Sequence, residues 1–337
     1  MAEREKEDRH DLAKRRIMLV LQRQIVANAR TLEQKIADAG PSHMRIDPHV
    51  LIPARNELVE EGLVQKTETA GNTWFHLANT PPEVVTERLE ELANLFRAFT
   101  ANNLPARYGQ TLEIATYRAL CAVQDLDFFG HFPDLHTHDD SKIYSKTEPP
   151  NHIGIRVLPG QKLLDFMVLH PDAGFLGLEC KNVREWMYPN RSEIRDLLLK
   201  CTVLNCLPVF IARRIPFVTF KLLNTAGALV HQTYNQLMPE TAADIVSRVR
   251  HKDMLGYHDI RMGNHPDARL LKFITTDMMN VAVAARDKFD LYKDLLAAYG
   301  SGEIPYHVFA AKIRRRSQGT KEDDDWPEGD EERAGNE

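Results

Sequence analysis

Apolar positions in the first 80 residues follow the spacing of three short helices. The first helix is indicated by apolar residues that recur at helical intervals: Ile17, Val20, Leu21 and Ile25. A second is predicted over residues 32–39, with Thr31 as its N-cap. A third is predicted over residues 48–61, because Asp47 is a suitable N-cap and Gly62 ends the pattern. The segment therefore predicts a small helical module.

Two runs with strand-like composition follow these helices. Residues 63–69 and 73–77 flank a turn at Ala70, Gly71 and Asn72, which predicts a β-hairpin. Three helices followed by a hairpin resemble the winged-helix family, over about 70 residues. The resemblance implies that the third helix enters the major groove of duplex DNA and that the hairpin follows the DNA backbone.

The resemblance also implies which side chains face the DNA. These candidates are Arg45, His49, Arg55, Asn56, Lys66 and Asn72. Glu57, Glu60 and Glu61 lie on the same third helix, where their charges would repel phosphate. Winged helices also dock proteins, so protein docking or simple scaffolding stays open as the alternative to DNA contact.

The rest of the chain alternates between helical and strand-like patterns. In chain order we expect a connecting amphipathic helix at 81–100, a helix at 110–122, a strand at 128–135, a polar loop at 139–151, two strands at 163–169 and 175–182 joined by a turn, a helix at 192–204 capped by Ser192, a strand at 207–213, a helix at 217–224 and a strand at 228–233. Residues 239–299 are predicted to be largely helical, with a break near 256–266.

These elements predict an α/β fold with a mixed central sheet flanked by helices. A winged-helix domain precedes this core, and a helical C-terminal region follows it. The expected boundaries are a winged-helix domain at 1–80, a connecting helix at 81–106, a core at 107–238, a helical region at 239–317 and an acidic disordered tail at 318–337.

Composition indicates a protein that acts inside the cell and limits its number of domains. The chain has 337 residues, 43% of them hydrophobic and 27% charged, which is enough for two modest domains with their own cores or for one domain with large appendages. No apolar run approaches the length that spans a bilayer, and the N-terminus is too charged for a signal peptide. Four cysteines without metal-binding spacing are expected to be free thiols. We therefore expect a cytoplasmic protein that does not bind membranes.

The net charge of −5 is concentrated in the tail. Residues 321–337 carry nine acidic side chains against only Lys321 and Arg333. Without this tail the body is near neutral or slightly basic, so the net charge does not exclude DNA as a partner.

The strongest chemical signal is Asp165 on one predicted strand, followed by Glu179-Cys180-Lys181 on the next. Alternation along a strand places Glu179 and Lys181 on one face and turns Cys180 to the other. The flanking residues are apolar, and two carboxylates with an ammonium are costly to place there unless they share a task. Two carboxylates suit a hard divalent cation, and a lysine beside them suits phosphodiester hydrolysis.

The same short motif also occurs elsewhere by chance. Glu33 and Lys35 have identical spacing, but they lie on a predicted helix, where positions two apart diverge. Only the set of Asp165, Glu179 and Lys181 has an acid on one predicted strand, a turn after it, and the Glu-x-Lys spacing on a second strand with alternating side chains. The alternative for these three residues is a surface salt bridge on an edge hairpin.

The order of helix, strand, Asp-bearing strand, Glu-x-Lys strand, helix and strand resembles the PD-(D/E)xK nuclease superfamily over residues 108–233. This superfamily includes type II restriction enzymes and junction resolvases. The resemblance implies that Asp165 and Glu179 bind the metal, that the carbonyl of Cys180 is a third ligand, and that Lys181 is catalytic. Leu164 replaces the proline of the motif, at one of its most variable positions.

Further site residues follow from the same resemblance. Many members carry an acid on the helix before the sheet, where Glu113 lies; the alternative is an exposed helix charge. Several subfamilies add a basic or amide side chain after the Glu-x-Lys strand. Arg191, Arg195 and Lys200 lie in the right region, and Gln232 follows the later strand. Arg191 and Arg195 are the candidates for DNA contact, and the alternative for each residue is a solvated surface charge.

Together these patterns predict an endodeoxyribonuclease that uses Mg²⁺, with Mn²⁺ as a substitute, and hydrolyses duplex DNA in restriction or phage defence. Because one site cuts one strand, we expect a homodimer, formed through the helices after Pro239. The alternatives are a winged-helix DNA-binding regulator and a nuclease subunit that works with a partner protein in a defence or repair assembly.

Overall fold

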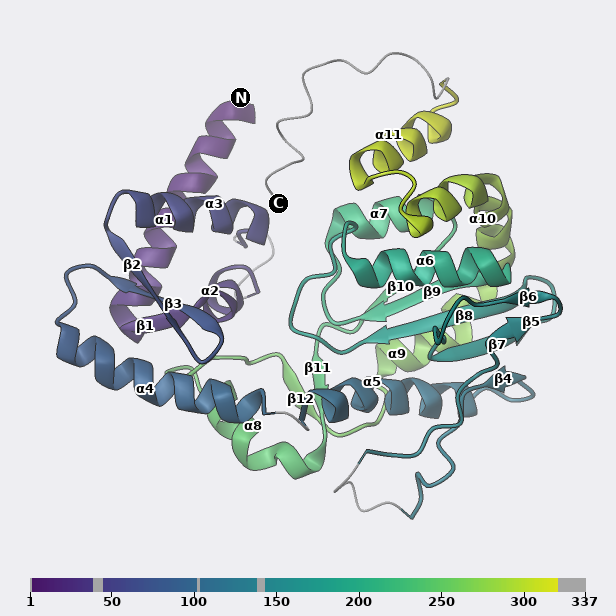
Figure 1. Cartoon of the computed structure of the whole chain (residues 1–337), viewed down its shortest axis with the longest axis horizontal. Helices are drawn as coiled ribbons and strands as arrows, with labels where there is room; N and C mark the ends of the chain where they lie inside the picture. The colour runs from purple at the N-terminus through teal and green to yellow at the C-terminus, as the bar shows by residue number, and fades with distance from the viewer. Residues whose placement is uncertain (1, 39–44, 102–103, 138–142, 321–337) are drawn as a thin grey trace. The chain divides into compact units, whose positions relative to one another are not determined.

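The computed structural model describes residues 2–38, 45–101, 104–137 and 143–320 and shows a mixed α/β protein (Figure 1). The chain forms two compact units. Among the described residues, the first unit contains those within 2–105 and 241–260, and the second contains those within 106–240 and 261–320. The helices predicted after Pro239 therefore do not form one region, because α8 (Ala243–Arg250) groups with the first unit. The acidic tail from residue 321 lies outside the described residues.

The first unit combines helices with a three-stranded antiparallel sheet in the order β1-β3-β2. Besides α8, its elements are α1 (Ala2–Gln24), β1 (Val26–Asn28), α2 (Ala29–Ile36), α3 (Pro48–Glu60), β2 (Val64–Thr69), β3 (Asn72–Leu77) and α4 (Pro82–Phe99). The predicted hairpin is confirmed: Thr69 pairs with Asn72, and Ala70 and Gly71 both have positive φ, as a two-residue turn requires. Helices α1 to α3 pack on this sheet around a buried apolar core.

Two details of the first unit differ from the sequence prediction. The second helix begins at Ala29, because the Asn28 side chain accepts a hydrogen bond from Thr31 N (2.8 Å). The prediction that Thr31 is the cap was therefore wrong. Strand β1 was not predicted, since three buried residues are too few to show an alternating pattern.

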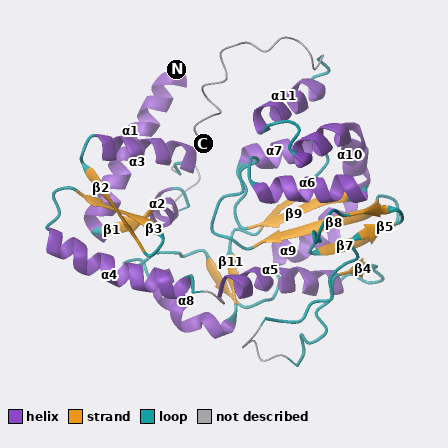
Figure 2. Ribbon diagram, viewed as in Figure 1, coloured by secondary structure: helices purple, strands orange, loops and turns teal. Residues whose placement is uncertain are grey.

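The second unit is built on a five-stranded mixed sheet in the order β10-β9-β8-β7-β4 (Figure 2). Strands β8, β9 and β10 are parallel, and β7 and β4 are antiparallel to their neighbours. The strands are β4 (Phe128–Phe129), β7 (Phe166–His170), β8 (Gly174–Lys181), β9 (Leu207–Ala212) and β10 (Leu229–Gln232). Two-stranded sheets pair β5 (His152–Ile153) with β6 (Arg156–Val157), and β11 (Gln236–Met238) with β12 (Ile260–Met262).

Helices cover both faces of this sheet (Figure 1). They are α5 (Leu104–Cys121), α6 (Ser192–Leu204), α7 (Phe217–Thr225), α9 (Ala268–Lys272), α10 (Met278–Ser301) and α11 (Tyr306–Ser317), with a π-helical turn at Phe273–Asp277. Successive residues of β8 show that α5 and α6 lie on opposite faces: Cys180 contacts Thr116 of α5, and Glu179 contacts Lys200 of α6.

The mixed sheet flanked by helices is confirmed, with two local corrections. The strand predicted at 128–135 is limited to Phe128–Phe129, because Gly130 turns the chain with a φ of 103°. Ser192 is the first residue of α6 and not its cap; Arg191 occupies the N-cap position, and the Ser192 hydroxyl donates to Glu193. Within the described part of the chain, no helix is long and apolar enough to cross a membrane.

Candidate active site

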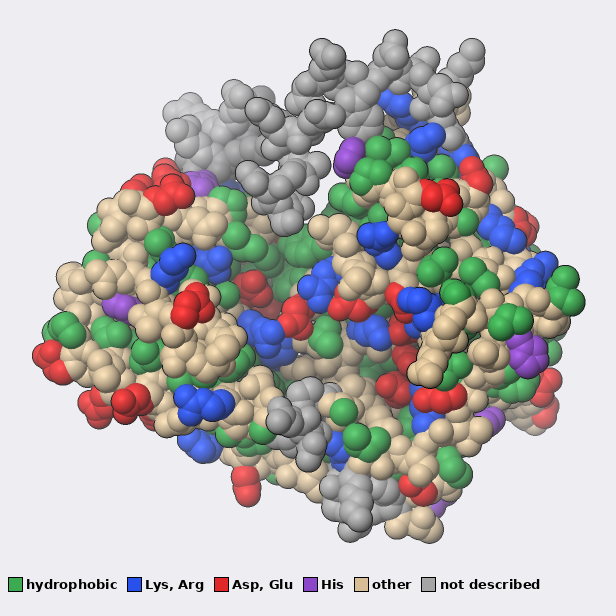
Figure 3. All heavy atoms as spheres, in the orientation of Figure 1, with side chains coloured by type: hydrophobic (Ala, Val, Ile, Leu, Met, Phe, Trp, Pro, Cys, Tyr) green, Lys and Arg blue, Asp and Glu red, His purple; other side chains and the backbone are tan. Residues whose placement is uncertain are grey.

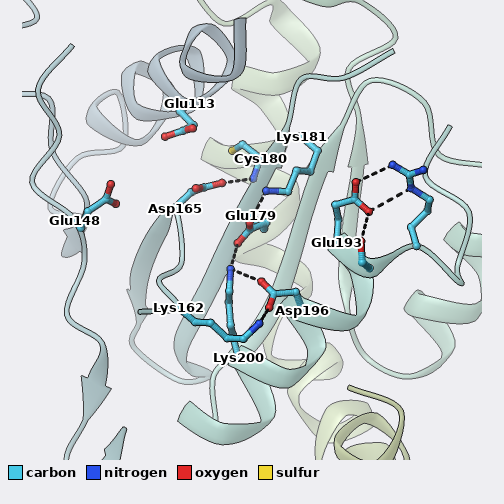
Figure 4. Close-up of polar contacts among 12 residues, drawn as sticks. Glu113, Glu148, Lys162, Asp165, Glu179, Cys180, Lys181, Glu193, Asp196 and Lys200 are labelled. Carbon is cyan, nitrogen blue, oxygen red and sulfur yellow. Dashed lines mark hydrogen bonds and ion pairs between the residues drawn. The ribbon is translucent and has the colours of Figure 1, made fainter. Parts of the chain in front are cut away.

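The β7–β8 hairpin brings Asp165 against the strand that carries Glu179 and Lys181 (Figure 4). Asp165 immediately precedes β7, whose first residue, Phe166, pairs with Leu178. The Asp165 N–H donates to Leu178 O (3.0 Å), and its carboxylate Oδ2 accepts from Cys180 N (2.6 Å). The Asp165 carboxylate is therefore fixed at the backbone of the Glu-x-Lys segment.

Alternation along β8 sorts the three motif residues as the sequence predicts. The Cys180 thiol lies 3.4 Å from the hydroxyl of Thr116 on one side of the sheet. Lys181 Nζ donates to Glu179 Oε1 (2.6 Å), so these two side chains share the other side. Glu179 is almost fully buried, with 6% of its side chain exposed, whereas 27% of Lys181 is exposed. Lys181 is thus the member of the pair that reaches solvent.

Burial and mutual repulsion work against the ionised form of both acids. Desolvation, and then the charge of Glu113, raises the pKa of Asp165, against the opposing charges of Lys146 and Lys181. Desolvation, and then the charge of Asp165, raises the pKa of Glu179. Each carboxylate therefore feels a neighbouring negative charge, and a cation shared by the two would relieve that repulsion.

Lysines supply the counter-charges in the described part of this site. Lys200 Nζ donates to Glu179 Oε2 (3.1 Å) and contacts Asp196 (2.7 Å), which in turn pairs with Lys162. Burial would lower the pKa of Lys200, but Glu179 and Asp196 raise it above its ordinary value. The result is a row of alternating charges that runs from Lys181 through Glu179 and Lys200.

A cavity of about 420 Å³ opens beside this row of charges. Its lining residues are Lys162, Glu179, Lys181, Ser192, Glu193, Arg195, Asp196, Leu199 and Gly300. Three of them are basic (Lys162, Lys181 and Arg195) and three are acidic (Glu179, Glu193 and Asp196). We call it the active-site cavity because it borders Glu179 and Lys181; its basic side chains could bind a phosphate group if a bound cation offset the carboxylates.

Glu113 lies close to the motif, as expected. It projects from α5 toward Asp165 (Figure 4), and its carboxylate accepts from Lys146 Nζ (2.7 Å). Its charge contributes to the raised pKa of Asp165. Glu113 is thus not an isolated exposed helix charge, and its part in catalysis stays a prediction.

The donor set suits a hard divalent cation that keeps some of its water. The described residues contain no cluster of three or more His, Cys, Asp or Glu side chains arranged to hold an ion alone. Mg²⁺ commonly binds through one or two carboxylates together with water and substrate phosphate. Asp165 and Glu179 supply these carboxylates, and the Cys180 carbonyl remains a predicted third ligand.

The residues predicted to contact DNA from the first unit are not equally available. His49, Asn56 and Lys66 are exposed. Arg55 instead lies over the ring of Phe75, 4.6 Å from its centroid, and burial lowers its pKa. Asn72 is half-buried and accepts from Thr73 N (3.0 Å), and Arg45 is half-buried too.

The two arginines predicted beside the active-site cavity differ in placement. Arg195 lines the cavity, and its guanidinium lies 5.6 Å from the centroid of the Tyr299 ring. Arg191 donates two hydrogen bonds to Glu193 (3.2 and 2.8 Å). A phosphate at Arg191 would therefore compete with an existing carboxylate partner.

Sequence analysis did not assign Lys146 to the site, and it treated Lys200 as a candidate phosphate contact or a solvated surface charge, not as a buried partner of Glu179. Lys146 lies in a segment predicted only as a polar loop, yet its ammonium contacts Glu113 and Asp165. Lys200 lies on the buried side of α6. Its position four residues after Asp196 was the available signal, because such pairs share a helix face.

Comparisons with protein-family models, with curated protein sequences and with solved structures gave no match for this chain. The site is therefore interpreted from its own geometry.

Gly130 controls the backbone next to Asp165, and substituting it is expected to be costly. A Cβ at Gly130 would lie 2.8 Å from Asp165 O and 2.7 Å from the Phe166 ring, at a φ of 103°. Gly130→Ala is expected to lower the free energy of unfolding by about 2–4 kcal/mol, measured by urea denaturation. At Gly154, also with positive φ, a Cβ would meet no described atom within 4 Å. Gly154→Ala should cost only about 1 kcal/mol, and equal losses for the two variants would contradict the expectation.

Proposed function

We propose that this chain is a Mg²⁺-dependent endodeoxyribonuclease of the PD-(D/E)xK, restriction endonuclease-like type, with a winged-helix module in its first unit. One observation carries the proposal. The hydrogen bond from Cys180 N to Asp165 Oδ2 sets the acid that immediately precedes β7 beside Glu179 and Lys181 on β8. A salt bridge on an exposed edge hairpin does not explain this arrangement, because β8 lies inside the five-stranded sheet and Glu179 is buried.

In this proposal each residue of the site has a distinct task. Asp165 and Glu179 would hold Mg²⁺, which supplies Lewis acidity at the phosphorus centre and lowers the pKa of water. Lys200 and the Cys180 N–H fix the orientation of the two carboxylates. Lys181, which is partly exposed, would donate to a phosphate oxygen or orient the attacking water. Lys162 and Arg195 line the same cavity, where they would attract the phosphate backbone.

The surface of the second unit favours local phosphate contacts over a broad basic patch. On the face drawn in Figure 3, Lys and Arg side chains lie interspersed with Asp and Glu side chains. Affinity for DNA would then depend on a few lysines and arginines near the active-site cavity. Binding of duplex DNA should weaken as salt rises, with a shallow slope that reflects few phosphate contacts.

The first unit supports the winged-helix part of the proposal through its element order. Helices α1, α2 and α3 precede the hairpin β2–β3, and β1 joins the same sheet. The exposed face of α3 carries His49, Ile52, Asn56 and Glu60. An apolar and an acidic residue on this face favour the second candidate, in which α3 docks a partner protein that recruits the nuclease.

Incubation of the purified full chain with supercoiled plasmid and Mg²⁺ tests the function. We expect nicked or linear DNA with Mg²⁺ or Mn²⁺ and intact plasmid with EDTA. Direct conversion to linear DNA would support a homodimer, whereas nicked circles alone would support a single site. Binding without cleavage would favour the regulator, and cleavage only after a second protein is added would favour the subunit of an assembly.

The affinity of the site for a divalent ion should rise with pH. Desolvation raises the pKa of Asp165 and Glu179 above their ordinary values of 3.8 and 4.5. Protons therefore compete with the ion for these carboxylates at pH values where an exposed carboxyl would already be ionised. In the metal-free protein the sign is opposite: folded carboxyls with raised pKa bind protons more readily, so stability falls as pH rises through the raised values. The rise in melting temperature caused by Mn²⁺ should therefore become larger as the pH increases. A rise that stays the same at every pH would contradict the expectation.

A further inference from the structure

Three aromatic residues that reach solvent follow the carboxyl ends of the strands beside the active-site cavity. Strands β8, β9 and β10 are parallel, and their register places Lys181 and Gln232 in one row (Figure 2). Trp186 and Tyr188 follow β8, and Tyr234 follows β10. The carboxyl ends of parallel strands share one edge of a sheet, where ligands commonly bind. The three aromatic residues therefore belong to the edge that carries the proposed site.

The backbone between Trp186 and Tyr188 is anchored to the segment after β9 and to α7. Met187 is fully buried; its N–H donates to Arg214 O (2.9 Å), and its carbonyl accepts from the Thr219 hydroxyl (2.8 Å). The rings on either side of it are partly exposed and stack, with centroids 6.5 Å apart and 22° between their planes. An anchored pair of stacked rings at the surface is a preformed platform for a third flat ring.

The next residues connect this pair of rings to the active-site cavity. Pro189 O accepts from the Tyr299 hydroxyl (2.7 Å), and the guanidinium of Arg195, a cavity residue, lies 5.6 Å from the centroid of the Tyr299 ring. The indole N–H of Trp186 is buried and has no acceptor among the described residues. The indole therefore loses no hydrogen bond when it turns toward a ligand.

Tyr234 brings positive charge to the same edge. It is 42% exposed, and its N–H donates to Arg213 O (3.1 Å). The guanidiniums of Arg214 and Arg269 lie 5.6 and 4.9 Å from the centroid of its ring. Arg214 thus links the two aromatic groups, because its carbonyl holds Met187 and its guanidinium meets Tyr234.

The acids that are close in sequence to these residues already have partners. The Asp267 carboxylate caps α9 and accepts from the backbone N–H groups of Arg269 and Leu270 (3.1 and 2.8 Å); it also lies 3.8 Å from Arg261. Glu185, which immediately precedes the aromatic pair, has an interaction partner too. The Arg269 side chain is exposed, so it is well placed to meet a phosphate.

We propose that Trp186, Tyr188 and Tyr234 form stacking sites for the bases of an unpaired DNA strand, and that Arg269 contacts its phosphates. Aromatic rings interleaved with basic groups bind single strands, because every base has a face that can stack. The ends of β8 and β10 are about 10 Å apart, two interstrand spacings. About three nucleotides cover that distance at ~3.4 Å each. The inference rests on the proposed nuclease and narrows its substrate to DNA with unpaired nucleotides beside the cut.

Fluorescence anisotropy of the full chain with a labelled thymidine strand of about 20 nucleotides tests the inference. EDTA is present, so no strand is cleaved. We expect the single strand to bind more tightly than a blunt duplex of the same length. Tyr234 has a φ of 65°, which asparagine tolerates, so Tyr234→Asn removes the ring without new backbone strain. It should weaken single-strand binding by about 5- to 100-fold, whereas Tyr234→Phe keeps the ring and should match the wild type.

Two further variants test stacking and phosphate contact separately. A base stacked on Trp186 should quench its emission, so the quenching caused by the thymidine strand should be smaller in Trp186→Phe, which keeps a ring and still binds. Equal quenching in the variant and the wild type would overturn the assignment of Trp186. Arg269→Gln should make the slope of log Kd against log salt shallower by about 0.7, the contribution of one phosphate on a single strand.

A matched control lies at the amino end of β8. Phe129 is 41% exposed, and its ring lies 6.4 Å from that of Phe175, the second residue of β8. Phe129→Ala should leave single-strand binding unchanged. An equal loss in Phe129→Ala and Tyr234→Asn would mean that any exposed ring gives the same result, and would overturn the inference.

The outcomes separate this inference from the proposed function. If the wild type prefers the duplex, or if Tyr234→Asn binds the single strand like the wild type, the inference is wrong even when the protein cleaves plasmid. If Tyr234→Asn loses single-strand binding and no DNA is cleaved with Mg²⁺, the inference stands and the nuclease proposal fails. Should Tyr234→Asn not fold, the exposed Arg269 keeps the test, and an unchanged salt slope in Arg269→Gln would overturn the inference.

Discussion

Lys181→Ala is expected to lower the rate of plasmid cleavage by about 10²–10³-fold, the effect of removing one donor that acts on charge formed in the transition state. Lys181 bonds Glu179 and lines the active-site cavity, with part of its side chain in solvent. It is therefore the cation of the motif best placed to meet a phosphate. Initial rates of supercoiled plasmid loss at saturating Mg²⁺ measure the effect.

The chain contains its own control for this substitution. Lys35 belongs to a Glu-x-Lys sequence of identical spacing on α2, where its Nζ donates to Lys252 O (2.6 Å). Lys35→Ala should leave the cleavage rate unchanged, because positions two apart on a helix do not share a face. If both variants lose activity equally, or if Lys181→Ala cleaves like the wild type, the assignment of Lys181 is wrong.

Lys200→Met is expected to lower the free energy of unfolding by about 2–3 kcal/mol, somewhat less than the roughly 3–5 kcal/mol typical of breaking a buried ion pair. Lys200 and Glu179 are each 6% exposed, so solvent cannot replace the missing ammonium. The loss is moderated because Lys181 still pairs with Glu179. Urea denaturation of the metal-free protein measures it.

Two further variants show whether the cost comes from the unpaired charge. Lys162→Met removes another lysine of the same row, but 42% of its side chain is exposed, so the loss should stay below about 1 kcal/mol. Glu179→Gln/Lys200→Met removes both charges and should recover most of the stability lost in Lys200→Met. Equal losses for Lys162→Met and Lys200→Met, or no recovery in the double variant, would show that Lys200 acts by packing alone.

Local sequence patterns were sufficient to predict the β7–β8 hairpin and the arrangement of the motif residues on it. The side-chain period of a strand is two, so placing Glu179 and Lys181 together required only that β8 be a strand. Gly174, with positive φ, ends the turn between the two strands. The same local logic predicted the β2–β3 hairpin, with Ala70 and Gly71 in its turn.

Contacts between distant segments could not be predicted in this way. Lys146 reaches Glu113 across 33 positions, and only the folded chain shows that Gln110 holds the intervening segment in place. In the sequence, Lys200 is one of several basic residues on an amphipathic helix. Whether its face of the helix is buried depends on how α6 packs on the sheet, which the sequence does not show. Arg55 looked available for DNA, but the ring of Phe75 from β3 attracts it.

Anomalous scattering from crystals grown with Mn²⁺ measures the central geometry most directly. We expect one peak within about 2 Å of carboxylate oxygens of both Asp165 and Glu179, and its loss in Asp165→Asn. No peak at these two residues, or an ion bound by only one of them, would contradict a hydrolytic site built on the β7–β8 hairpin.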